Sequence, residues 1–304
     1  MRWIVPFLLS ATMAFAQTAA PPATESAKQP ESVTVTGLKN VPQAVIDRFI
    51  DTYAAPAYLL DKMSRWEEGI CPVATGLRPA AIKFILERLK ENAAKVGAPV
   101  SRRASCQTNI EIVFTTTPQG LLDNVRKDHV MLLGYASSNS QADRLALVKR
   151  DIQAWYTTAT MDLTGFTKID NSRTIGLGDS NEFAMTLGSG NVTGFHMADG
   201  RRSALFNVIV AVNPVKLADH EIGAIADYVS FLALSQLASL DRCQPLPSII
   251  NMLVPDCAAQ ADALTESDLA FLRGLYKMRA DGNLQMQKDF ISYQMRNAFQ
   301  RAQK

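Results

Sequence analysis

One apolar segment with a carboxylate at its centre constrains the fold more than any other feature. Nearly every residue between 219 and 240 is apolar, yet Asp227 stands in the middle and Asp-Arg-Cys follows directly. Charges inside a membrane span are rare and costly, so we expect a buried central helix instead of a transmembrane one. A buried carboxylate needs a cation or a hydroxyl as its partner. Arg65 and Arg242 are possible partners, and the sequence does not choose between them.

The composition indicates a globular chain of the α/β (α+β) class. Its 304 residues can bury a sizeable core, since 47% of them are hydrophobic and 20% are charged. The 31 Lys and Arg residues nearly balance the 29 Asp and Glu residues, and no tract is strongly basic. Nucleic acid is therefore not an expected partner, because it is bound through concentrated positive charge. We expect a single globular domain over residues 31–304.

The first residues have the form of a secretory signal peptide. Arg2 precedes an apolar run, and Ala14-Phe15-Ala16 has the small-residue pattern of a cleavage site. We expect residues 1–16 to be removed, leaving a periplasmic or secreted protein with no integral membrane segment. Residues 17–30 are rich in Ala, Pro, Thr and Gln, which is typical of a flexible lead-in.

The four cysteines all lie in the expected mature chain, and an even number in an exported protein favours disulfides. Three pairings are possible. Cys71 and Cys106 flank one helical segment, whereas Cys243 and Cys257 flank one Pro-containing loop. We therefore expect these two local pairs. A structural zinc site is not expected, because none of the four has another Cys or His within four residues.

Hydrophobic periodicity and capping residues predict most of the regular elements. The clearest helix runs from Pro79 to Val96, with Pro at its first turn and Gly97 after its end. A capping box predicts another helix from Thr265, and residues 284–302 form an amphipathic helix expected to dock on the protein body. The remaining expected elements are strands at 31–38, 109–115, 150–160 and 203–212 and short helices at 41–51 and 121–127.

Two short motifs resemble catalytic or cofactor sites without the residues that those sites need. Gly178-Asp179-Ser180-Asn181 is similar to the nucleophile block of GDS-type esterases, which require a histidine base. None of the three histidines, His129, His196 and His220, has an aspartate three residues before it. Gly188-Ser189-Gly190 with Gly194 has one residue too many for a dinucleotide-binding loop. No cofactor is expected.

His220-Glu221 begins like the H-E-x-x-H motif, in which two histidines on one helical face hold zinc. Ala224 occupies the position of the second histidine, and Asp227 lies about 10 Å farther along the helix, too far to share one ion. We expect no metal site here. Asp227, Glu221 and His220 stay the only weak candidates for catalytic residues.

The stretch from Ser203 to Tyr276 resembles the active-site half of the metzincin-like zinc proteases. An apolar strand and a long helix precede Pro-Ser-Ile-Ile-Asn at 247–251, where that family has its Met-turn. Leu264-Thr265-Glu266-Ser267-Asp268 and Leu275-Tyr276 are similar to the family's ending. The resemblance implies a zincin-like core at 203–277, with a mixed sheet and a long buried central helix.

The same resemblance implies a degenerate site without metal ligands. If Phe231-Leu232-Ala233-Leu234 corresponds to the Ala-Leu-Gly-Leu of the family helix, Asp227 stands where the catalytic glutamate would be. Ala226 and Ser230 then replace the two helix histidines, and Gln236 falls near the third.

The whole chain also resembles an exported proteobacterial protein family, through Arg65-Trp66, Cys71-Pro72, Gly76-Leu77 and the pair Cys106 and Asn109. That resemblance implies a compartment and no activity. We expect a non-catalytic binding or structural protein of the periplasm or cell envelope, with an unidentified protein or peptide as a possible partner. The alternative is a hydrolase with a non-zinc site around Asp227.

Overall fold

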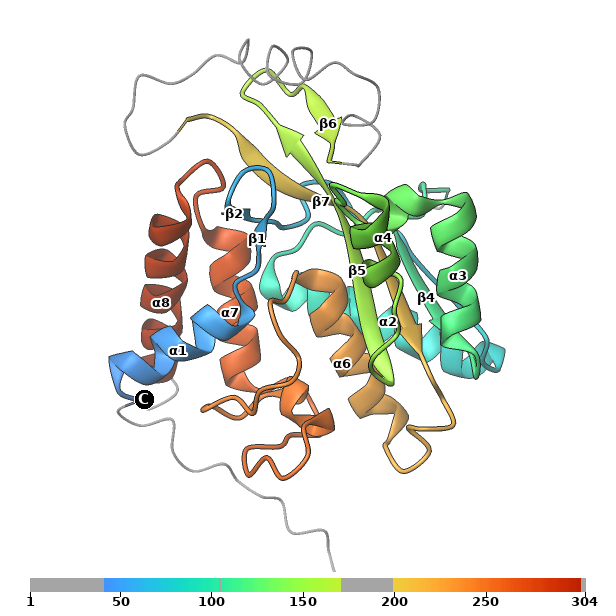
Figure 1. The fold of residues 1–304 in the computed structure, drawn as a ribbon. Coiled ribbons are helices and arrows are strands. Elements are labelled where there is room, and N and C mark those ends of the chain that lie inside the picture. The colour runs from blue at the N-terminus through green and yellow to red at the C-terminus, as the bar shows by residue number, and fades with distance from the viewer. Residues whose placement is uncertain (1–40, 104, 171–198, 302–304) are drawn as a thin grey trace, which may run out of the picture. The chain divides into compact units, whose positions relative to one another are not determined.

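In the computed structural model, which describes residues 41–103, 105–170 and 199–301, the chain is built around a five-stranded mixed sheet (Figure 1). Strands β3, β4 and β7 run parallel, and β5 is antiparallel to its neighbours β7 and β6. This mixed sheet and its helices confirm the expected α+β class. In spatial order the strands are β3 (Pro72–Thr75), β4 (Ile110–Phe114), β7 (Arg202–Val212), β5 (Ile152–Met161) and β6 (Thr167–Ile169).

Helices cover both faces of the sheet (Figure 1). The larger core lies between the sheet and α2 (Pro79–Val96) with α6 (Ile222–Leu234). A smaller core on the other face is closed by α3 (Pro118–Asp128) and the 3₁₀ helix η1 (Val130–Leu133). The other elements are α1 (Gln43–Tyr53), the hairpin of β1 (Pro56–Ala57) and β2 (Lys62–Met63), α4 (Asn139–Leu145), η3 (Ile249–Leu253), α7 (Glu266–Lys277) and α8 (Leu284–Arg301).

Helix α2 has the bounds that its sequence predicts. Pro79 occupies the first turn, and Gly97 ends the helix in the left-handed conformation with φ 83°. Both positions follow from local chemistry, since proline lacks the first amide proton and glycine tolerates positive φ. The apolar stripe with Ile85, Leu89 and Ala93 is buried and packs toward α6.

The central helix is shorter than expected. The apolar segment predicts a helix over 219–240, but α6 begins after Glu221 and ends before Ser235, which is extended. Leu237 and Leu240 lie beyond the helix end and still pack against the core. The apolar character of both residues therefore predicted their packing against the core, although the helix ends before them.

The C-terminal helices form an antiparallel pair that docks on the body. The Thr265 side chain accepts the amide of Asp268 and the Asp268 side chain accepts the amide of Thr265, so the predicted capping box is present. Helix α8 packs against α7 and α1, burying Ile291, Met295 and Phe299. The expected docking of the C-terminal helix is thus observed.

Both disulfides join the expected local pairs. Cys71 is bonded to Cys106 and Cys243 to Cys257. Gly76 follows β3 with φ +91°, and a Cβ built there would lie 1.9 Å from the carbonyl oxygen of Phe114. Only glycine fits this turn, which leads from β3 into α2.

Several expectations concern residues outside the described ranges. They are the signal peptide at 1–16, the lead-in at 17–30, the strand at 31–38, the motifs that begin at Gly178 and Gly188, and His196. Among the residues that are described, no helix has the length and apolarity needed to cross a bilayer.

Candidate functional site

Asp227 lies in a closed polar cluster between α6, α2 and the loop before α7. Its carboxylate accepts hydrogen bonds from Arg88 Nε at 2.7 Å, Arg88 Nη2 at 2.9 Å, Asn92 Nδ2 at 2.8 Å and the Leu264 amide at 3.1 Å. The residue is only 1% exposed. Desolvation raises the pKa of Asp227, but these four donors outweigh it and hold the pKa below the ordinary value. Asp227 is therefore an ionised structural carboxylate.

The partner of Asp227 is neither of the residues proposed from the sequence. Arg65 pairs with Glu67 at 2.7 Å and donates to carbonyls at the end of α7. Arg88 and Asn92 supply the charge and the amide, from positions four residues apart on α2. That spacing puts both on one face of the helix, next to its apolar stripe, and is the sequence signal that was missed.

Glu221 and His220 do not join Asp227 in a site. Glu221 is exposed at the N-cap of α6, and its side chain makes no capping hydrogen bond. His220 is partly exposed, with its backbone amide bonded to the carbonyl of Leu217. Across the described residues, no three His, Cys, Asp or Glu side chains are grouped so that they could hold a metal ion.

The positions that correspond to the family's helix histidines are closed as well. Ala226 and Ser230 are fully buried, and the Ser230 hydroxyl donates to the carbonyl of Ala226 at 2.6 Å. Gln236 lies just after the helix, and its Oε1 atom is buried without a hydrogen-bond partner. These side chains offer a metal ion no cluster of ligands.

The C-cap residue Ser235 and three side chains from other parts of the chain satisfy the last carbonyls of α6. Ser235 Oγ donates to Phe231 O at 2.8 Å and Tyr156 Oη to Leu232 O at 3.0 Å. Trp66 Nε1 donates to Ala233 O at 2.8 Å, and Tyr276 Oη to Leu234 O at 2.8 Å. A buried helix end has no water for these four groups, so β5, the segment before β3 and α7 supply the donors instead.

The loop that resembles a Met-turn is fastened to α7 by Asp268. This buried carboxylate accepts hydrogen bonds from Ser248 Oγ at 2.6 Å and the Ile249 amide at 2.9 Å, besides those from Thr265. Tyr53 Oη lies 2.6 Å from the same Ser248 Oγ. Burial raises the pKa of Asp268 to about 6 despite these donors. The cluster is enclosed and joins three elements, which indicates a structural role.

A cavity of about 920 Å³ lies beside the sheet. It is lined by residues 66–69, by the loop residues 101–103 and 105–109, and by β5, β6 and the start of β7. The size lies within the range of sites that enclose a small organic molecule.

The floor of this cavity is apolar and contains a β-bulge. Met161 of β5, Ile169 of β6 and Phe206 of β7 contribute side chains. The register of β5 and β7 shifts so that Phe206 has no partner residue, and its ring is 39% exposed. Next to it, Asn207 is almost fully buried, yet its Oδ1 atom has no hydrogen-bond partner among the residues that the structure describes. An unpaired buried carbonyl oxygen is costly unless a ligand or water donates to it.

The wall of the cavity is held by covalent and polar links. The Cys71–Cys106 disulfide ties the loop to the start of β3. Asn109 strengthens the link, since its Oδ1 accepts the amide of Cys71 at 2.7 Å and its Nδ2 donates to Gly69 O at 3.2 Å. These links tie residues Cys106 and Asn109 of the cavity wall to the start of β3 and the segment before it.

The rim carries two cations that face solvent. Arg102 and Arg103 are exposed, and neither side chain has an ion-pair partner among the described residues. Glu67, in contrast, pairs with Arg65 at 2.7 Å and lies 3.9 Å from Arg202. The two unpaired guanidinium groups can thus bind an anion at the cavity mouth.

The lining of the cavity combines apolar side chains, a buried acceptor and charged groups. Among the described residues, the lining includes Phe206 and Met161, the Oδ1 acceptor of Asn207, the cations Arg102 and Arg103, and the carboxylates Glu67 and Glu68. The sequence analysis missed this cavity, because its residues come from six separate segments. No family model, curated protein or solved structure matches this chain.

Proposed function

We propose that this protein is an exported, non-catalytic binding protein whose ligand is an amphipathic organic anion held in the sheet cavity. The observation that carries the proposal is the unpaired Oδ1 of buried Asn207 beside the apolar floor. Buried acceptors are normally satisfied, so this atom marks the place where a ligand donates a hydrogen bond. Apolar ligand surface contacts Phe206 and Met161, and an anionic group reaches Arg102 and Arg103.

Three residues that carry the resemblance to exported proteobacterial proteins support the same location. Trp66, Cys106 and Asn109 all line the cavity. The two disulfides support export, because they form and persist in oxidising compartments.

The zincin-like resemblance is compatible with a binding role. That resemblance rests on the sequence between Ser203 and Tyr276. The hydrolase alternative has less support, because Asp227 is enclosed by four donors and cannot reach a substrate. We infer a zincin-like frame whose former catalytic position now stabilises the packing of two helices.

The proposal can be tested with anilinonaphthalene sulfonate, a fluorescent probe that joins an aromatic body to an anion. We expect saturable binding to the folded protein. Phe206→Ser should weaken the affinity about tenfold, because it removes most of the exposed ring from the floor. Phe84→Ser is the matched control, since Phe84 is 42% exposed on α2 and lies outside the cavity lining.

A second pair of variants tests the anionic contact. The double variant with Arg102→Gln and Arg103→Gln should bind the probe more weakly, and its affinity should depend less on the salt concentration. Lys83→Gln with Lys90→Gln removes two exposed cations from α2 and should change neither. Near-ultraviolet circular dichroism must show native packing in every variant. Equal affinities in Phe206→Ser and Phe84→Ser would contradict the proposed site.

A further inference from the structure

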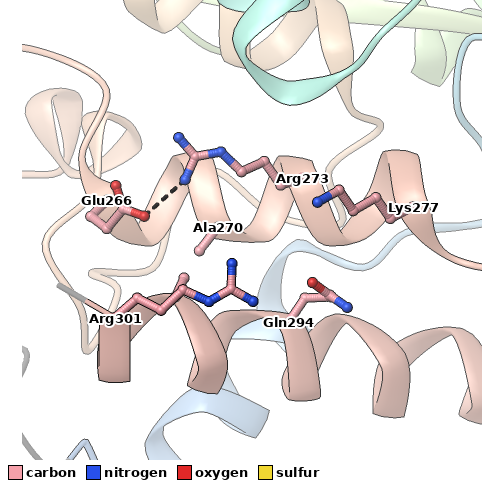
Figure 2. A pocket seen from close by; sticks show the side chains of 7 residues that line it. Glu266, Ala270, Arg273, Lys277, Gln294 and Arg301 are labelled. Atoms are coloured by element: carbon pink, nitrogen blue, oxygen red, sulfur yellow. Dashed lines mark hydrogen bonds and ion pairs between the residues drawn. The ribbon is translucent and has the colours of Figure 1, made fainter. Parts of the chain in front are cut away.

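A groove between α7 and α8 holds more cationic side chains than its carboxylate can neutralise. Its volume is about 330 Å³, and it shares no lining residue with the sheet cavity. Figure 2 shows Arg273 and Lys277 extending along it from α7, with Arg301 reaching in from α8. Glu266 is the only acidic residue among the described residues of the lining. Two positive charges are therefore in excess.

Small residues at the helix contact make room for this groove. Gly274 lets α8 approach α7 closely, since a Cβ built there would lie 3.1 Å from Ile291 Cα. Ala270 and Ala298 then form the base between the longer side chains. The cations are thus held at the two sides of a shallow groove by two packed helices (Figure 2).

Internal ion pairing does not account for the positive charge. Arg273 and Lys277 lie four residues apart on the same helical face, where like charges repel. Glu266 accepts one bond from Arg273 Nη1 at 2.9 Å. Lys277 and Arg301 have no side-chain partner within the ranges that the structure describes. The helix dipole favours Lys277 and Arg301 in the last turns of α7 and α8, yet it gives no reason for the Arg301 side chain to point toward the other cations.

We propose that this groove is a second binding site, specific for a phosphate group. A phosphate carries close to two negative charges at neutral pH, which equals the excess in the groove. Its oxygens can accept from several donors at once, and guanidinium groups suit that geometry. The Gln294 side chain, which lies beside Arg301 in Figure 2, adds a neutral amide donor.

The first test uses inorganic phosphate, added to the full chain at constant ionic strength and followed by titration calorimetry. We expect saturable binding at one site. Lys277→Gln and Arg301→Gln should each weaken the affinity about tenfold, because each removes a charged hydrogen-bond donor. Lys83→Gln, an exposed cation on α2, is the matched control and should leave the affinity unchanged.

A gain of affinity gives an independent check. Glu266→Gln removes the competing carboxylate and frees the Arg273 guanidinium, so phosphate should bind several-fold more tightly. Glu87→Gln is the control, because it removes an exposed carboxylate from α2, outside the groove. A merely structural Glu266–Arg273 pair would show destabilisation with no gain in phosphate affinity.

A vesicle experiment separates two sources of the phosphate group. Phosphatidylcholine vesicles with and without phosphatidic acid are sedimented with the protein. Co-sedimentation that requires phosphatidic acid, and that Arg301→Gln abolishes, assigns the site to a lipid headgroup even where free phosphate binds weakly. Binding of free phosphate alone assigns it to a soluble phosphate. Absence of both, or binding that the groove variants leave unchanged, overturns the proposal.

Discussion

Replacing Asp227 by alanine should cost about 3–5 kcal/mol of folding free energy, the range for breaking a buried ion pair. The structure shows where this cost arises. Asn92 is 1% exposed and loses its acceptor, as does the Leu264 amide, at about 1–3 kcal/mol each. The Arg88 side chain is 33% exposed and can turn toward water, so it adds less.

Asparagine at the same position separates shape from charge. Its amide oxygen can still accept from Arg88 Nε and Asn92, but its NH₂ group would face Arg88 Nη2 and the Leu264 amide, which are both donors. We therefore expect Asp227→Asn to cost about 2–3 kcal/mol, since two of the four hydrogen bonds are lost. An amide of equal shape therefore replaces the Asp227 carboxylate only in part, because it keeps two of the four hydrogen bonds.

The assay is urea unfolding followed by circular dichroism, with Arg88→Ala and the double variant completing a cycle. The pKa of Asp227 is lower in the folded protein than in the unfolded chain. Its stabilisation is thus complete above about pH 4 and is lost as the pH falls through the folded pKa. An Asp227→Ala protein as stable as the parent at pH 7 would refute the structural assignment and favour a catalytic role.

Three further predictions concern the rest of the fold. Replacing Cys243 and Cys257 together by serine should remove about 3 kcal/mol of stability, because the disulfide closes a loop of about 15 residues. Calorimetry of this double variant should show a lower Tm than that of the parent. Gly76→Ala should cost at least about 2 kcal/mol, more than Gly97→Ala, because both have positive φ but only Gly76 faces a backbone carbonyl; equal urea midpoints would contradict this. Because the pKa of Asp268 is raised to about 6, the folded state keeps this proton between about pH 4 and pH 6, whereas the unfolded chain releases it. The contribution of Asp268 to the free energy of unfolding is therefore largest in acid and falls by about 3 kcal/mol across that window. Asp268→Asn should remove this slope from the pH dependence of unfolding.

Local chemistry made some elements predictable from the sequence. Helix α2 matches its expected bounds because Pro79 and Gly97 act on the backbone directly. The capping box at Thr265 and the two disulfides depend on residues close together in the chain. Strand β3 was missed, since four residues that begin with a proline carry no clear period.

Contacts between distant segments made the site unpredictable. Arg88 lies 139 residues from Asp227 in the sequence, and only the packing of α2 on α6 brings them together. The sheet cavity likewise depends on the bulge at Phe206, which no local pattern announces. A single sequence records burial and turn chemistry, whereas such sites depend on how the elements pack.

The four side chains that satisfy the end of α6 make its last turn depend on the whole fold. Fraying of this turn would break the hydrogen bonds that Tyr156, Trp66 and Tyr276 donate to its last three carbonyls. These buried groups could reach water only if β5, the segment before β3 and α7 opened at the same time. Helix ends usually exchange their amide protons through local openings of low free energy. Here the amide protons of the last turn should exchange only through global unfolding, so their exchange rates measure the cooperativity of the entire domain.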